Sequence, residues 1–165
     1  MPDDSTQRIR IFSVETRFQK LARRGGGVPR NAAIENAQSK IEEAKPGFEG
    51  WLTQEVQLLA DLINSVKEGH APPGWIDVAS DQSAQLRDIG TTMHCELVTF
   101  IASSLCDVLD AIAAGSPCNM DSIVCHVDAL LVARQKPYRD MKPEQVPKLT
   151  SGLRKVVDHV SVSPS

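Results

Sequence analysis

Apolar residues recur at every third or fourth position through much of this chain, which is the spacing of one buried face of an α-helix. Two such stripes follow one another in the middle of the sequence, with a short break at Thr91-Thr92. Neighbouring stripes joined by a short break predict a helical hairpin, and a hairpin needs other helices to cover its apolar faces. The two stripes are Ile76, Ala79, Ser83, Leu86, Gly90 and Met93, then Leu97, Ile101, Leu105, Val108 and Ile112.

The same spacing predicts further helices on both sides of the hairpin. Asn31 is a candidate N-cap for the first, Pro46-Gly47 should interrupt or kink it, and Asn119 or Asp121 should cap the helix after the hairpin. Only Arg8–Ser13 alternates with the period of a strand. We therefore predict an all-α fold, an up-and-down helical bundle. The flanking helices are predicted at residues 32–44, 48–66, 123–131 and 144–160.

The chain has 165 residues, which suits one domain, and its charge is unevenly distributed. We expect a basic arm and linker at 1–28, a bundle at 29–161 and a tail at 162–165. Residues 1–30 hold seven basic and three acidic side chains, a balance of +4, so the net charge of -3 leaves the remainder at -7. The arm is either a solvated leader or a device for docking or self-association. The net charge gives no case for nucleic-acid binding.

Composition and sequence motifs limit which other functions we expect for this chain. Cys95, Cys106, Cys118 and Cys125 show no metal-type spacing, so we expect reduced thiols and no metal site. No apolar run reaches the roughly 18 residues of a membrane span, and the N-terminus has no apolar signal core, so we expect a cytoplasmic protein. The chain holds no glycine-rich phosphate loop and no hydrolase or zinc-protease motif. We expect neither a cofactor nor a catalytic residue.

One stretch resembles a known family. Ala84-Gln85-Leu86-Arg87-Asp88, followed by Thr91 to His94, Leu97, Ala102 and Leu105, is similar to the signature of histidine-phosphotransfer (HPt) domains. That signature reads His-x-Leu-Lys-Gly, a small-residue run, Phe-Gly and Leu-x-x-x-Ala-x-x-Leu. Ala84 stands in place of the phosphoacceptor histidine, Asp88 in place of the glycine and Met93 in place of the phenylalanine. Ile101 falls on the alanine position, with Ala102 beside it.

A second, shorter resemblance is to CheE-type accessory proteins of chemotaxis operons, through residues 104–110 and 126–130. The first resemblance implies a four-helix core and a docking face for a receiver domain or a histidine kinase. In the family, a cation three residues after the histidine shares its helix face and attracts the phosphoryl group, and the glycine lets a receiver approach. Arg87 keeps that cation. Asp88 adds a negative charge that an acidic receiver would repel, which favours a kinase as the partner, or no phosphorelay partner at all.

The resemblance therefore implies a non-catalytic signalling module that binds through Ala84, Arg87 and Asp88, with Gln85 and Thr91 at the rim. Three alternatives remain open. The stretch is a generic amphipathic helix; or the protein is structural and self-associates through its basic arm; or phosphotransfer uses His94 or His126. We expect His94 at a helix end and His126 at a solvated edge.

Overall fold

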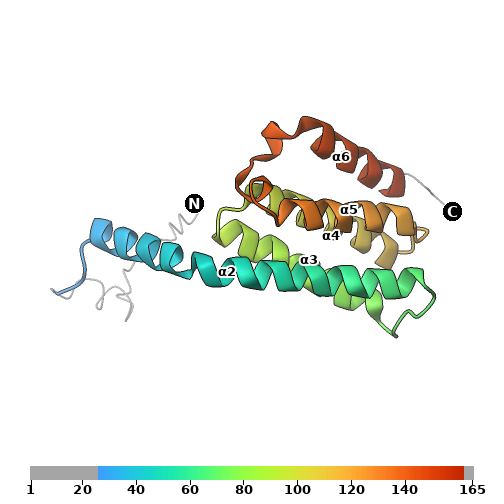
Figure 1. The fold of residues 1–165 in the computed structure, drawn as a ribbon, viewed down its shortest axis with the longest axis horizontal. Helices are drawn as coiled ribbons and strands as arrows, with labels where there is room; N and C mark the ends of the chain where they lie inside the picture. Colours follow the sequence, from blue (N-terminus) through green and yellow to red (C-terminus); the bar gives the residue numbers. More distant parts are fainter. Residues whose placement is uncertain (1–25, 162–165) are drawn as a thin grey trace, which may run out of the picture. The chain divides into compact units, whose positions relative to one another are not determined.

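The computed structural model describes residues 26–161, and every regular element among them is helical (Figure 1). This confirms the all-α prediction. The basic segment up to residue 25, with the possible strand at Arg8–Ser13, and the tail 162–165 lie outside the described residues. The elements are α2 (Arg30–Lys67), α3 (Trp75–Thr92), α4 (Glu96–Ala113), α5 (Met120–Ala133), two 3-10 turns (Tyr138–Asp140 and Pro143–Gln145) and α6 (Pro147–Ser161).

The chain divides into two compact units, residues 1–40 and 41–165, and the division falls inside α2 rather than at residue 28. Of the first unit the structure describes residues 26–40, whose side chains are exposed apart from the half-buried Ala32. The second unit contains the hydrophobic core and every site considered below.

α2 corrects the predicted N-cap at Asn31 and, of the interruption or kink predicted at Pro46-Gly47, excludes the interruption. It begins at Arg30, so Asn31 lies within its first turn instead of capping it, and the Ala33 N–H bonds to the Pro29 carbonyl at 2.9 Å. The helix also continues through Pro46, where one backbone hydrogen bond is missing because proline has no N–H. It ends at Lys67, and the predicted stop residue Gly69 follows, with the left-handed φ of 86° that is common after a helix C-terminus.

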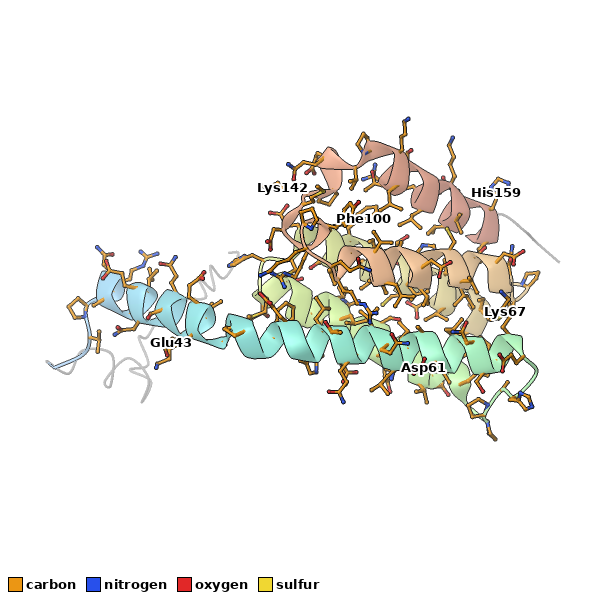
Figure 2. The ribbon with its side chains drawn as sticks, in the orientation of Figure 1. Glu43, Asp61, Lys67, Phe100, Lys142 and His159 are labelled. Atoms are coloured by element: carbon orange, nitrogen blue, oxygen red, sulfur yellow. The ribbon has the colours of Figure 1, made fainter. Side chains whose placement is uncertain are left out.

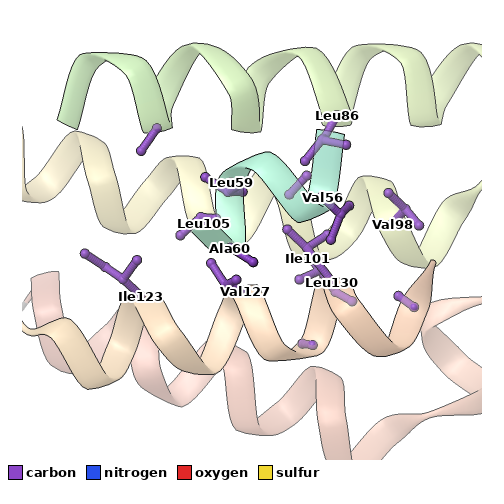
Figure 3. Packing of buried hydrophobic residues seen from close by; sticks show 14 of the residues in the cluster. Val56, Leu59, Ala60, Leu86, Val98, Ile101, Leu105, Ile123, Val127 and Leu130 are labelled. Atoms are coloured by element: carbon purple, nitrogen blue, oxygen red, sulfur yellow. The ribbon is translucent and has the colours of Figure 1, made fainter. Parts of the chain in front are cut away.

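α4 is the central helix of the bundle and contacts α3, α5 and α6 (Figure 1). All five residues of its predicted stripe are buried, and so are Val98, Ala102 and Leu109 on its other sides. A helix that is apolar around most of its circumference is a core helix. Figure 3 shows its Ile101 and Leu105 among Leu59 of α2 and Val127 of α5.

The α3–α4 hairpin turns after Thr92 rather than at the predicted break, Thr91-Thr92. Thr91 and Thr92 remain helical, and the left-handed residue is His94, with φ of 59°. The Cys95 N–H bonds to the Gly90 carbonyl at 2.8 Å and the His94 N–H to the Thr91 carbonyl at 3.2 Å, which is a Schellman motif. His94 therefore lies at a helix end, as predicted.

Gly90 lets α3 and α4 approach each other closely. A Cβ atom added at Gly90 would lie 2.7 Å from Thr99 Oγ1, which is held by a 3.1 Å hydrogen bond to the Cys95 carbonyl. Overpacking costs about 1–3 kcal/mol, and alanine gains back about 1 kcal/mol of helix propensity. We expect Gly90→Ala to lower the free energy of unfolding by about 1 kcal/mol in urea titrations. In a Thr99→Ala background the same change should be neutral or stabilising; an equal loss there would place the strain elsewhere.

Candidate functional site

The five residues predicted for docking lie on α3, on the side away from the Leu86 stripe. At about 100° per residue, Arg87, Asp88 and Thr91 fall within about 60° of Ala84 around the helix, and Gln85 lies about 100° away. Ala84 is half-buried, while Gln85, Asp88 and Thr91 are exposed. The structure therefore brings four of the five together as one surface, the α3 face (Ala84, Arg87, Asp88 and Thr91). Gln85 lies beyond its edge.

The cation of the α3 face is already paired. Arg87 Nε lies 2.9 Å from Asp88 Oδ1, with side-chain exposures of 40% and 67%. The Asp88 carboxylate raises the pKa of Arg87 further above its ordinary value, and Cys106 and Asp110 of α4 act in the same direction. Arg87 thus lies close to α4. The pair presents almost no net charge, so Asp88 does not add the isolated negative charge that its sequence position suggests.

Thr91 connects the α3 face to the surface of α4. Its hydroxyl donates a 2.8 Å hydrogen bond to the Arg87 carbonyl, so its methyl group and an acceptor lone pair of its oxygen remain for a partner. Thr91 also lines an open hollow of about 430 Å³ with Thr99, Phe100 and Ser103 of α4. A partner on the α3 face would therefore meet a shallow, largely apolar depression next to a neutral ion pair.

His94 also lines a second hollow, of about 300 Å³. Its main charged group is Arg139, whose side chain is only 10% exposed and lies 2.9 Å from Glu49 and 3.5 Å from Asp140. The Arg139 hydrogen bond holds the pKa of Glu49 below its ordinary value. With two carboxylates on the guanidinium, the charge of this hollow is satisfied internally, and it offers no free cation for an anionic ligand.

His126 is not at a solvated edge, and that prediction is wrong. Its ring is fully buried; Nε2 lies 2.8 Å from Ser104 Oγ and Nδ1 lies 2.7 Å from the Ser122 carbonyl. A carbonyl only accepts hydrogen bonds, so Nδ1 carries the proton and Nε2 accepts from the Ser104 hydroxyl. Burial lowers the pKa of His126, which keeps the ring neutral. Neither nitrogen is available to a phosphoryl donor in this fold.

The described part of the chain offers few other groups that could react or bind a metal. The four cysteines are free thiols, and Cys106 is buried as predicted for a small core residue. Among residues 26–161 no three His, Cys, Asp or Glu side chains gather as metal ligands would. Of the helices that the structure describes, none is both long enough and apolar enough to cross a bilayer.

Comparison with known proteins adds no relative. No protein-family model, curated protein or solved structure matches the chain.

Proposed function

We propose that the protein is a non-catalytic binding module similar to HPt domains, and that its α3 face binds a receiver domain or a histidine kinase. The observation that carries the proposal is the position of Ala84. It lies on the accessible side of a bundle helix, at the place that the HPt signature gives to the phosphoacceptor, and Arg87 shares its face one turn further on. Ala84 has no nucleophile, so the surface binds without accepting a phosphoryl group.

The Arg87–Asp88 pair removes the main objection to a receiver partner. A lone carboxylate would repel the acidic phosphorylation site of a receiver, whereas a carboxylate 2.9 Å from a guanidinium is largely compensated. The hollow beside Thr91 gives the same partner an apolar contact. Receiver and kinase therefore both remain within the proposal, and affinity measurements separate them.

The test is capture from lysate of the source cells, followed by identification and measurement of Kd with the purified receiver or kinase domain. Arg87→Glu places a second negative charge beside Asp88 and near Asp110, and we expect it to weaken binding at least tenfold. Ala84→Trp should do the same through bulk at the centre of the face.

Lys148→Glu is the matched control, because Lys148 is an exposed cation on α6, away from the α3 face. It should bind like the native protein. Capture of no receiver or kinase, or equal binding by Arg87→Glu and Lys148→Glu, would refute the α3 face as a phosphorelay surface. Light scattering on the same samples tests the alternative of self-association.

A further inference from the structure

His126 links two helices, α4 and α5, through hydrogen bonds of its buried ring. It belongs to α5, its Nε2 accepts from Ser104 of α4, and its Nδ1 donates to the Ser122 carbonyl one turn earlier on α5. Protonating Nε2 would turn this acceptor into a donor, so the Ser104 hydroxyl would have to reverse its hydrogen bond. It would also place a full charge where the ring has no exposed surface, which is costly without water.

α6 is the side from which water can reach this point. Ser104 lines a hollow of about 210 Å³ with Arg154 and Val157 of α6, and Ser122 lines another of about 310 Å³ with Lys155 and Val156. Against α4, by contrast, α5 is closed by Val127 and Leu130, which are 4% and 0% exposed. Ser104 and Ser122, which bond to His126, each line a hollow that residues of α6 also line. The contact between α4 and α5 is closely packed at Val127 and Leu130.

Few fully buried side chains attach α6 to the rest of the bundle. Among the described side chains of α6, Thr150, Leu153 and Val160 are buried, and Leu149 and Val157 are half-buried against the core. The Arg154 guanidinium lies 5.4 Å from the ring centre of Phe100 as a surface contact. Figure 2 shows Phe100 on α4 and His159 on the last turn of α6. An exposed cation–π contact is worth about 0.5–1 kcal/mol. Moving α6 is therefore the least costly way to hydrate a charged His126.

The charged groups around His126 do not remove this cost. Asp107 of α4 favours the charged ring, but burial outweighs it and keeps the pKa of His126 below the ordinary value of 6.5. From α6, Arg154 and Asp158 lie on the Ser104 side, and Lys155 and His159 on the Ser122 side. These groups include two permanent cations, Arg154 and Lys155, against the one carboxylate of Asp158.

We propose that α6 is an acid-released cover: protonation of His126 detaches α6 from α4 and α5 and uncovers the surface around Phe100, Ser103 and Ser104. Proton linkage gives the direction in which pH changes the stability of the closed form. The released form binds a proton that the closed form excludes, so the closed form is fully favoured above pH 6.5 and loses stability as pH falls below it. The switch does not rest on the proposed function, although Phe100 and Ser103 also line the hollow beside Thr91.

Hydrogen exchange with mass spectrometry on the full chain tests the switch, with protection factors corrected for the intrinsic effect of pH. Between pH 7.0 and 5.0 the protection of α6 should fall about tenfold. The limit at pH 5.0 is about 30-fold, because each pH unit below 6.5 contributes at most a factor of ten. α3 should stay protected. Unchanged protection of α6, or an equal loss in α3 and α6, would overturn the proposal.

His126→Asn should abolish the pH dependence of α6, because asparagine does not titrate. His159→Asn is the matched control: it removes an exposed histidine of the same region and should leave the pH dependence intact. Dependence that survives His126→Asn, or disappears in His159→Asn, contradicts the assignment. NMR titration of the His126 ring in the native chain gives an answer even where His126→Asn does not fold. A pKa below 6.5, in step with the α6 amides, supports the switch, and any other titration refutes it.

Discussion

Leu105→Ala should lower the free energy of unfolding by about 2–5 kcal/mol, which is a large fraction of the stability of an ordinary domain. Leu105 is fully buried at the middle of α4, the helix that contacts α3, α5 and α6. Removing its terminal carbons leaves a cavity that neighbours on several helices would have to fill, and a closely packed core relaxes only in part. Urea unfolding followed by far-UV circular dichroism measures the loss.

Leu58→Ala is the control of equal chemistry. Leu58 lies on α2 with 46% of its surface exposed, so its replacement removes little buried area and should cost less than about 1 kcal/mol. Equal losses for the two variants, or a loss below about 1 kcal/mol for Leu105→Ala, would show that α4 is not the centre of the core.

Periodicity predicted the helices of this protein well because burial is distributed along its sequence. The stripe from Leu97 to Ile112 is buried at every position, and Asn119 caps α5 by accepting from the Asp121 and Ser122 N–H groups at 3.0 and 3.4 Å. Pro147 is the first residue of α6, where its missing N–H costs nothing. These features depend on local chemistry, which a sequence displays directly.

The errors arose where packing outweighs local preference. Pro46 removes one hydrogen bond, yet α2 continues through it, since the buried residues that follow, from Phe48 to Ile63, hold the helix in place. At the turn of the hairpin, side-chain hydrogen bonds from Thr91 and Thr92 to the carbonyls one turn earlier accompany the extension of α3 beyond the predicted break. Intrinsic preference is a weak prior in such places.

The candidate site divides in the same way. The arc formed by Ala84, Arg87 and Thr91 follows from helix geometry alone, so the sequence predicted that these residues share the side of α3 opposite Leu86. The burial of His126 was missed, although its spacing from Ile123 and Leu130 puts it in their stripe. Its partner Ser104 is 22 residues away on another helix, and no local pattern reveals such a pair.

Ala84→His combined with Asp88→Gly should convert the α3 face from a phosphoryl-inert surface into a phosphoacceptor. Histidine at this position supplies an imidazole on the accessible side of α3, and its nitrogens are nucleophiles near neutral pH. Glycine removes the carboxylate that lies 2.9 Å from Arg87 Nε, which frees the guanidinium for the phosphoryl group one turn from the new histidine. Glycine in a helix interior costs about 1 kcal/mol, which we expect the bundle to tolerate.

The measurement uses a purified receiver domain phosphorylated with acetyl phosphate, and scores acid-labile, base-stable label on the protein. We expect no label on the native chain, strong label on the double variant and less on Ala84→His alone, where Asp88 still occupies Arg87. Lys148→His with Asp88→Gly is the matched control, because Lys148 is exposed on α6, a different helix from Arg87. The prediction fails if a receiver binds the double variant but does not label it, or if the control is labelled equally. Either result would mean that the α3 face lacks the geometry of a phosphotransfer surface. The likeness to HPt domains would then reflect helical periodicity alone.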